Sequence, residues 1–287
     1  MCQPVTKIVF LGVEIDCLER TLSLPLEKLD ETRLMIKRAR MKKRFRKKEL
    51  QKIIGKLNWC ARVVTGGRTF MRNLINIMVT LKCNHHHTRL SAAAKADLAW
   101  WDSGLEVFHG HTPFFSDVAL PSHQFSTDAC LVGGGAAFEN DWFYVSWCVD
   151  LPEIQSSHIN SLELQTVLIA AEKWGNSWFG KTILVRSDNM AAVSALNKGT
   201  SRGLDLLGII QRLFWLSVKY SFKLTAMYLP GSLNILSDRI SRMNDVNCAY
   251  QAQQMLTNEQ DLEVNGHMSH DTFIWLLQEW EKMNSKA

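Results

Sequence analysis

The sequence lacks the features of a membrane protein or a secreted protein. No segment holds the roughly 18 uninterrupted apolar residues that a membrane-spanning helix needs. The first residues, MCQPVTKIVFLGVEID, contain a short apolar run that ends in acidic residues, which excludes a secretory signal. These absences predict a cytoplasmic or nuclear protein that does not bind a membrane.

Closely spaced cysteines are also absent. The seven cysteines are scattered, and no two lie within four residues of each other, which excludes a zinc knuckle and a redox CxxC motif. We therefore expect reduced thiols in the interior. Cys83 precedes three histidines, at positions 85–87, but no second cysteine or acidic residue stands nearby. This stretch is predicted to be a polar loop rather than a metal site.

Proline is scarce, with 6 in 287 residues, and the composition is otherwise that of a globular protein with one large domain or two modest ones. Charge is uneven along the chain. Residues 1–120 hold 21 Lys+Arg and 11 Asp+Glu, whereas residues 121–287 hold 12 and 17. A basic front half and an acidic back half indicate a surface for a polyanion beside a metal-binding catalytic domain.

Residues 1–110 are predicted to be mainly helical after an N-terminal β-hairpin. The hairpin is expected from residues 7–16 and 20–24, with its turn near Glu19 and Arg20. Apolar spacing then predicts four helices, at about 25–43, 47–64, 68–82 and 91–107.

Residues 122–243 are predicted to form an α/β domain, after a linker at 111–121. The expected strands are 122–129, 134–139, 143–148, 181–187 and 222–228, and the expected helices are 161–175, 189–197, 204–218 and 233–242. Strands that alternate with helices after a three-strand meander predict a mixed sheet flanked by helices. Residues 244–287 are expected to be a polar tail with a terminal amphipathic helix at about 269–283.

Four carboxylates stand in settings that favour a metal site. They are Asp128 in FSTDAC, Glu163 in HINSLELQTV, Asp188 in ILVRSDNMAAV and Asp238 in LNILSDRISR. Two follow apolar strands and two lie on helical segments, and a buried acid is costly unless something charged binds it. One strand-end Asp is usually a turn former, so the prediction depends on all four together.

Converging acids favour divalent cations with oxygen ligands, Mg²⁺ or Mn²⁺. Two such ions about 4 Å apart can activate a water and stabilise the leaving oxygen of a phosphodiester. This chemistry needs ionised oxygen donors and no nucleophilic Ser or Cys, so the four acids suffice for a nuclease.

Residues 122–242 resemble the ribonuclease H domain of retroelement reverse transcriptases, most closely the tyrosine-recombinase retrotransposons of the DIRS and Ngaro type. The matching strings are STDA with a following GGGA, HINSLEL, VRSDN and LPGSLNILSDRISR. The resemblance implies a ribonuclease H-like fold and cleavage of the RNA strand of RNA·DNA hybrids, leaving a 3′-hydroxyl and a 5′-phosphate. It also implies that the four acids are catalytic and hold two Mg²⁺ ions, and that Asn189 and Asn234 orient the backbone or the hybrid.

The N-terminal half of the chain resembles the same family. FLGVEID is similar to the segment that closes the polymerase palm, and LQKIIGKLNWCARVVTGGRTFMRNL is similar to the helical thumb-like region. The Tyr-x-Asp-Asp signature of the palm is absent, so the resemblance implies a C-terminal piece of a reverse transcriptase that does not polymerise.

One position departs from the family. The family commonly has His-Ile-Pro-Gly, whereas this chain has Tyr228-Leu229-Pro230-Gly231. That histidine resembles the mobile histidine that helps product leave cellular ribonucleases H. Tyr228 is therefore a candidate for altered product release, because a phenol does not take a proton at neutral pH as an imidazole does.

The densest basic run of the chain is residues 33–48, with ten Lys and Arg. A solvated helix face is the simpler interpretation of such a run, but its density beside a predicted nuclease favours phosphate contacts. The predicted nucleic-acid-binding residues here are Lys42, Lys43, Arg44, Arg46, Lys47 and Lys48.

Two other functions stay open from the sequence. A catalytically inactive or domesticated remnant would bind nucleic acid through the basic run, although four intact acids argue against decay. A related fold with a transposase or junction-cleaving role is disfavoured by the polymerase-like front half.

Overall fold

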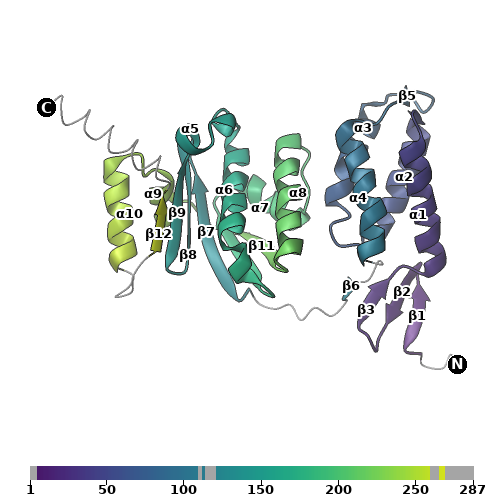
Figure 1. Ribbon diagram of the computed structural model, residues 1–287, viewed down its shortest axis with the longest axis horizontal. Coiled ribbons are helices and arrows are strands. Elements are labelled where there is room, and N and C mark those ends of the chain that lie inside the picture. Colours follow the sequence, from purple (N-terminus) through teal and green to yellow (C-terminus); the bar gives the residue numbers. More distant parts are fainter. Residues whose placement is uncertain (1–4, 109–111, 114–120, 259–264, 269–287) are drawn as a thin grey trace. The chain divides into compact units, whose positions relative to one another are not determined.

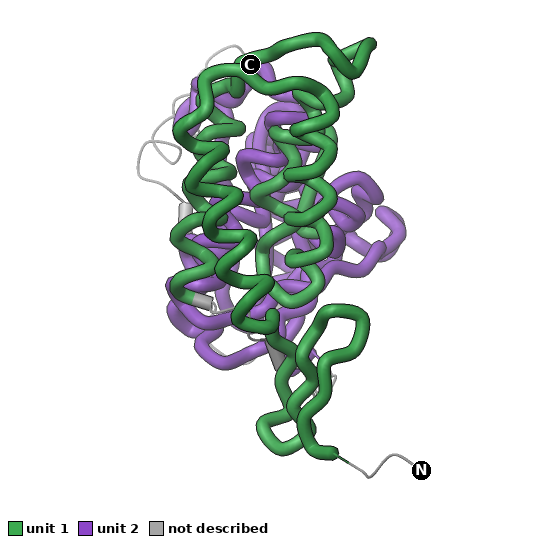
Figure 2. The backbone as a smooth tube through the Cα atoms, turned by 90° about the vertical axis from the view of Figure 1, so that its right-hand side faces the viewer, with its two compact units in different colours: residues 1–119, 199–202 green, residues 120–198, 203–287 purple. Residues whose placement is uncertain are grey.

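The computed structural model describes residues 5–108, 112–113, 121–258 and 265–268. It has two compact units, residues 1–119 with 199–202 and residues 120–198 with 203–287 (Figure 2). The predicted linker at 111–121 lies mostly outside the described residues. None of the helices in the described ranges has the length and apolar character needed to cross a bilayer.

A four-stranded antiparallel sheet opens the first unit (Figure 1). Its strands, in order, are β1 (Lys7–Phe10), β2 (Val13–Asp16), β3 (Thr21–Ser23) and β6 (Thr112–Pro113). The single strand predicted over 7–16 is wrong, because the chain turns at Leu11 and Gly12, which have φ angles of 49° and 81°. A Cβ atom at Gly12 would also lie 2.9 Å from the Trp59 ring, so this turn requires glycine.

Four helices form the rest of the first unit, as predicted. They are α1 (Leu26–Met41), α2 (Lys47–Cys60), α3 (Arg72–Thr80) and α4 (Ala92–Phe108), with the 3₁₀ turn η1 (Thr69–Met71) and the short strands β4 (Phe45–Arg46) and β5 (His87–Thr88) between them. At the start of α2, Glu49 Oε2 accepts a hydrogen bond from the backbone N–H of Arg46 at 2.8 Å. Leu50 and Leu57, two turns apart on α2, are fully buried, which explains why this amphipathic segment packs as a helix.

A mixed six-stranded sheet forms the centre of the second unit (Figure 1). Its order is β11 (Lys223–Tyr228), β10 (Thr182–Ser187), β7 (His123–Ala129), β8 (Gly133–Phe138), β9 (Asp141–Ser146) and β12 (Asn265–Met268). Strand β10 is parallel to β7 and β11, whereas β8 is antiparallel to both of its neighbours. The parallel pairs bring the carboxyl ends of three strands to one edge.

Helices cover both faces of this sheet. They are α5 (Trp147–Asp150), α6 (Ile159–Trp174), α7 (Met190–Lys198), α8 (Leu204–Lys219), α9 (Ile235–Ser241) and α10 (Val246–Asn258), with the 3₁₀ turns η2 (Pro152–Ile154) and η3 (Gly175–Trp178). Side chains alternate along β9: Phe143 joins the core under α6 to α8, whereas Tyr144 packs with Ile240 of α9 and Ala252 of α10. The expected fold class, a mixed sheet flanked by helices after a mainly helical region with an N-terminal hairpin, is confirmed.

Strand β8 is glycine-rich because helices approach it closely from both faces. A Cβ atom at Gly134 would lie 2.4 Å from Thr166 Oγ1 of α6. One at Gly135 would lie 2.4 Å from Ile240 Cγ2 of α9. Neither position has room for a side chain, so these two glycines let α6 and α9 sit close to the sheet.

The predicted polar tail is wrong for residues 246–258, which form helix α10. Ala249 and Ala252 face α9 and pack near Met243. The apolar stripe of α10 toward α9 is made of these small side chains, so the stripe is weak in the sequence. The terminal helix predicted at 269–283 lies outside the described residues.

Candidate metal centre

Two of the four predicted carboxylates lie at the carboxyl ends of neighbouring strands in the mixed sheet. Asp128 is the penultimate residue of β7, and Asp188 directly follows β10. The two strands are parallel, and their register pairs Ser126 with Arg186, so each aspartate lies two residues further along. Parallel neighbours end at the same edge, which brings together two acids that are far apart in the sequence.

Glu163, on α6, joins these two aspartates. Carboxylate oxygens of Asp128, Glu163 and Asp188 all lie within 4.8 Å of one another. Glu163 is only 4% exposed, and its Oε2 has no hydrogen-bond partner among the described residues. A buried carboxylate oxygen without a donor is costly, so this atom is a natural ligand for a cation.

Asp238 lies near the cluster but is not one of its three members. Its Oδ1 accepts a hydrogen bond from Arg242 Nε at 2.7 Å, and its Oδ2 lies 3.3 Å from Arg239 Nη1. Its side chain is 29% exposed. Arg242 follows Asp238 by four residues, the spacing at which side chains meet on a helix. Two guanidinium groups from its own segment therefore balance the charge of the fourth acid.

The three clustered acids have raised pKa values. Burial, with added repulsion from Asp128 and Asp188, raises the pKa of Glu163 to about 9. Burial also raises the pKa of Asp128 to about 6, although the Ser241 hydroxyl opposes this change. The pKa of Asp188 is raised too, again chiefly by burial. Without a cation the cluster therefore retains a proton at neutral pH, and a bound cation would replace it.

The donor set fits a hard divalent cation such as Mg²⁺, because every donor is a carboxylate oxygen. Asp128, Glu163 and Asp188 would hold the ion, and the unpartnered Glu163 Oε2 is the atom that most lacks a positive neighbour. Asp238 could act as a fourth ligand if its ion pairs with Arg239 and Arg242 were broken.

The two asparagines predicted to orient backbone or hybrid both bond to protein groups. Asn189 Oδ1 accepts from the backbone N–H groups of Ala191 and Ala192, each at 3.0 Å, and so caps α7. Asn234 is 2% exposed, and its Nδ2 donates to the Thr127 carbonyl at 2.9 Å. A role of the two asparagines in orienting the hybrid stays a prediction.

Tyr228 is the last residue of β11, and its register partner is Ser187, the residue before Asp188. It therefore lies at the same edge of the sheet as the acids. Its side chain is exposed to 44%, so a histidine at this position would also reach solvent. A role in product release stays a prediction.

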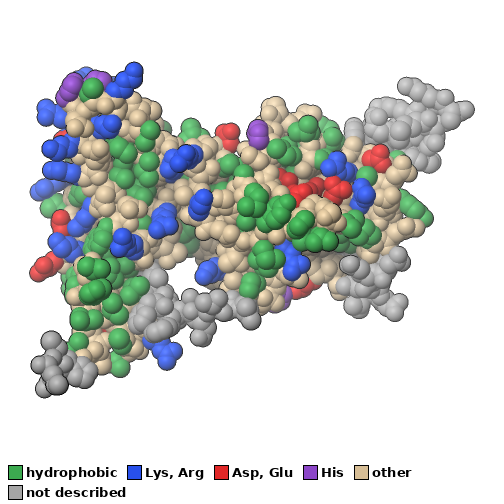
Figure 3. Space-filling view, turned by 180° about the vertical axis from the view of Figure 1, so that it is seen from behind, with side chains coloured by type: hydrophobic (Ala, Val, Ile, Leu, Met, Phe, Trp, Pro, Cys, Tyr) green, Lys and Arg blue, Asp and Glu red, His purple; other side chains and the backbone are tan. Residues whose placement is uncertain are grey.

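The six basic residues predicted to contact phosphates lie in the first unit, from the end of α1 to the start of α2. Figure 3 shows Lys and Arg side chains spread over this unit. Lys42 pairs with Glu49, Lys47 donates to the Leu81 carbonyl, and Arg46 Nε donates to His87 Nε2. Lys43, Arg44 and Lys48 are exposed, as are Lys42 and Arg46, whereas Lys47 is half-buried. These six residues therefore lie on the connection between two helices and at the start of α2, and they do not share a single helix face.

The cysteine prediction is confirmed for Cys60, which is buried, and wrong for Cys17 and Cys83, which are exposed. On the predicted polar loop, the donor atoms of Cys83, His85 and His86 lie within 4.8 Å of one another. All three residues are exposed, and three donors are one fewer than a closed structural zinc site has.

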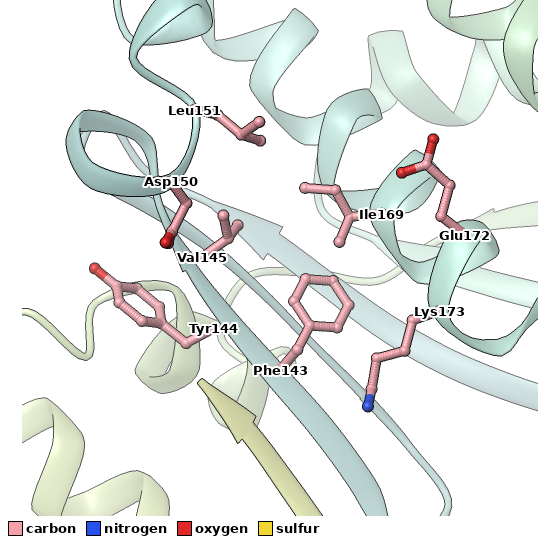
Figure 4. Close-up of a pocket in the computed structure, with 8 residues that line it drawn as sticks. All are labelled: Phe143, Tyr144, Val145, Asp150, Leu151, Ile169, Glu172 and Lys173. Carbon is pink, nitrogen blue, oxygen red and sulfur yellow. The ribbon is translucent and has the colours of Figure 1, made fainter. Parts of the chain in front are cut away.

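A cavity of about 530 Å³ lies beside β9, α5 and α6, away from the four acids (Figure 4). Its walls are mainly apolar, and Asp150, Glu172 and Lys173 are its charged lining residues. It contains none of the predicted site residues, so it is separate from the metal centre.

Sequence reasoning missed the side chains that hold the acids in place. Ser241 Oγ donates to Asp128 Oδ2 at 2.6 Å, and Arg242 holds Asp238. The available signal was helical spacing, because these residues follow Asp238 by three and four positions. That spacing indicates which side chains share a face of α9, but it does not identify what α9 packs against.

No family model matches this sequence, and no curated protein matches it. Among solved structures, the fold is similar to ribonuclease H1 of Halobacterium salinarum, with 12% identity and a TM-score of 0.33, over 42% of this chain and 95% of that one. It is also similar to the foamy viral protease-reverse transcriptase in complex with RNA/DNA hybrid, with 16% identity and a TM-score of 0.31, over 77% of this chain and 29% of that one.

A third similar structure is the N-terminal ribonuclease H domain of a Mycobacterium tuberculosis protein, fused to maltose-binding protein. It has 10% identity and a TM-score of 0.31, over 48% of this chain and 99% of that one. All three identities are below 25% and all three TM-scores are below 0.5.

Proposed function

We propose that this protein is a metal-dependent ribonuclease H that hydrolyses the RNA strand of RNA·DNA hybrids. The observation that supports this proposal most is the convergence of three acids from β7, α6 and the end of β10. One buried carboxylate oxygen of this cluster, Glu163 Oε2, has no hydrogen-bond partner in the part of the chain that the structure describes. Carboxylates arranged in this way suit Mg²⁺, with Mn²⁺ as the alternative ion.

In this proposal Asp128, Glu163 and Asp188 supply the oxygen ligands, and Asp238 adds a fourth carboxylate. Two bound ions would activate a water and stabilise the leaving oxygen of the phosphodiester. Burial of Asp128 and Glu163 excludes water from one side of the cluster, while the partly exposed Asp188 leaves an approach for the substrate.

Residues 122–243 would be the ribonuclease H domain, and residues 244–287 would follow it as a C-terminal extension. Residues 1–110, joined by a linker at 111–121, would be the end of a polymerase palm with a thumb-like or connection-like helical region. The strings shared with the DIRS and Ngaro retrotransposons support a retroelement origin. No Tyr-x-Asp-Asp string occurs in the sequence, so this chain by itself should not polymerise. The site of action would be the cytoplasm or the nucleus.

Hybrid would be held by its phosphates through Lys42, Lys43, Arg44, Arg46, Lys47 and Lys48. Lys43, Arg44 and Lys48 should contribute most, because the other three already bond to protein groups. Asn189, at the start of α7, would help to orient the strand beside the acids, while Asn234 acts through the β7 backbone.

The test is a cleavage assay on a hybrid with end-labelled RNA, with Mg²⁺ and with EDTA. We expect Mg²⁺-dependent RNA products that carry 5′-phosphates, and no cleavage of single-stranded RNA or of duplex DNA. Hybrid binding without cleavage at any Mg²⁺ or Mn²⁺ concentration would contradict the proposal and support the alternative, a catalytically inactive nucleic-acid-binding remnant.

A further inference from the structure

Helix α9 is attached to strand β7 by three polar side chains that share one helix face. Asn234, Ser237 and Ser241 stand at spacings of three and four residues, so they lie along one stripe. Asn234 Nδ2 donates to the Thr127 carbonyl at 2.9 Å, and the hydroxyls of Ser237 and Ser126 lie 2.6 Å apart. Ser241 Oγ donates to Asp128 Oδ2 at 2.6 Å.

These three contacts reach consecutive residues of β7. Ser126 and Asp128 point toward α9 because side chains alternate along a strand, and Thr127 between them offers its backbone carbonyl. Ser237 and Ser241 are fully buried, and Gly135 of the neighbouring strand leaves room for the helix. The register of α9 on β7 is therefore set by bonds that water cannot replace.

Ser241 has two acceptors within reach. A buried helical serine often bonds only to a carbonyl of the preceding turn, and the Asp238 carbonyl lies 3.0 Å from Ser241 Oγ. The distance to Asp128 Oδ2 is 2.6 Å, which is typical of a hydroxyl that donates to a carboxylate. The single hydroxyl proton is therefore directed to the acid.

We propose that Ser241 is a positioning residue that holds the Asp128 carboxylate in the orientation needed to bind the divalent cation. The inference rests on the proposed function, because it assumes that Asp128 is a metal ligand. A carboxylate fixed in advance loses less rotamer freedom when the ion binds. Ser241 also ties α9, the helix that carries Asp238, to β7, the strand that carries Asp128.

Ser237 supplies a matched control. It lies on the same helix, is equally buried, and loses the same single oxygen on substitution by alanine, but its partner is Ser126 rather than an acid. Asn234 and Ser241 would still hold the register of α9 in Ser237→Ala. The two alanine variants thus separate loss of packing from loss of the bond to Asp128.

The experiment is calorimetric titration of Mg²⁺ into the nucleic-acid-free protein, with Mn²⁺ titration followed by electron paramagnetic resonance as a second measurement. We expect Ser241→Ala to weaken binding about 10-fold or more, as loss of a group that orients a ligand commonly does. Ser237→Ala should stay within about 3-fold of wild type. Circular dichroism and the melting temperature report folding for both variants.

Two results would overturn the inference: Mg²⁺ binding by Ser241→Ala within 3-fold of wild type, or equal weakening in both variants. If Ser241→Ala does not fold, Ser241→Cys is compared by the same criteria, because a thiol fills the space of the hydroxyl, being somewhat larger, but donates weakly. Failure of the proposed function is distinguished by the cleavage assay, in which the wild-type protein would leave hybrid intact whether or not it binds Mg²⁺ in the titration.

Discussion

The functional charges of the two units differ in sign and in burial. In the second unit, three acids are clustered, largely buried and raised in pKa, with one carboxylate oxygen unpartnered. In the first unit, the basic residues between α1 and α2 are mostly exposed, and three of the six bond to neighbouring protein groups. Burying the clustered acids costs folding free energy, whereas the basic side chains between α1 and α2 are largely solvated and cost little.

This difference indicates which charges demand a ligand. A buried cluster of like charge is destabilising unless a proton or a cation balances it, so its arrangement points to a function. An exposed lysine is solvated by water, so the fold is equally stable with or without a bound phosphate. Each such lysine should therefore add its own contribution to hybrid affinity, and salt should screen that contribution. Substitutions in the two units should therefore differ in size and in kind.

The largest expected effect is that of Asp188→Asn. The change keeps the side-chain volume and removes one charged member of the cluster, so hybrid cleavage should fall by at least about 10³-fold, roughly 4 kcal/mol of transition-state stabilisation. Asp238→Asn should cost less, roughly 10–100-fold, because this acid is outside the cluster and already paired with arginines. Single-turnover cleavage at saturating Mg²⁺ measures both, and equal losses would remove the distinction between clustered and paired acids.

The next effect is on hybrid affinity, measured against salt concentration. Replacing Lys43, Arg44 and Lys48 with Gln should flatten the slope of log affinity against log salt by up to roughly 0.9 for each phosphate that the protein no longer neutralises. Replacing Lys42 and Lys47, which bond to Glu49 and to the Leu81 carbonyl, should flatten it less per residue. Fluorescence anisotropy with labelled hybrid gives both slopes. Unchanged slopes in both variants would mean that the run is only a solvated surface.

Arg242→Gln tests whether the pairing of Asp238 competes with cation binding. Removing this guanidinium frees Asp238 Oδ1 and deletes a positive charge beside the cluster, so Mg²⁺ should bind about 3–10-fold more tightly at low ionic strength. The gain should shrink as salt is added, because Arg242 is partly exposed. Calorimetry without nucleic acid is the measurement, and weaker binding would show that Arg242 supports the site instead of competing with the ion.

Tyr228→His should produce a smaller change, about 2–5-fold in steady-state turnover near neutral pH, with an acidic limb near the ordinary His pKa of about 6.5. The reason is that a mobile imidazole at this edge of the sheet would help the cleaved phosphate end to leave, a step that follows the chemistry. Single-turnover rates should change much less. Equal changes in both rates would contradict a role in product release.

A separate effect is expected on the stability of the metal-free protein, apart from cleavage and binding. Folding raises the pKa of Glu163 from 4.5 to about 9, so the folded state holds this proton more tightly than the unfolded state. Stability from this group is then fully present below pH 4.5 and is lost as pH rises toward about 9. The melting temperature in EDTA should fall by roughly 10 °C or more over that range, because a pKa shift of this size corresponds to several kcal/mol of stability. Mg²⁺ should restore the melting temperature increasingly at high pH. Glu163→Gln should weaken both trends, leaving the smaller contributions of Asp128 and Asp188, and identical melting curves for the two proteins would refute the assignment.

Much of the fold could be predicted from local patterns. The five predicted strands of the second unit and the four helices of the first are all present, with their ends shifted by a few residues at most. Apolar spacing specifies these elements because each depends on neighbours along the chain. Two local signals were misjudged: the glycine turn at Gly12, which splits a long apolar run, and α10, whose apolar stripe is made of small residues.

The sequence by itself determined the four acids and the types of element that carry them. Only the tertiary structure decided how those acids differ. Parallel pairing of β7 with β10 brings Asp128 to Asp188, and burial on α6 isolates Glu163 from solvent donors. The packing of α9 on β7 gives Asp128 a serine and leaves Asp238 to its arginines. These outcomes depend on strand order and on which helix face is buried. Both are set by contacts between distant residues, for which one sequence carries no local signal.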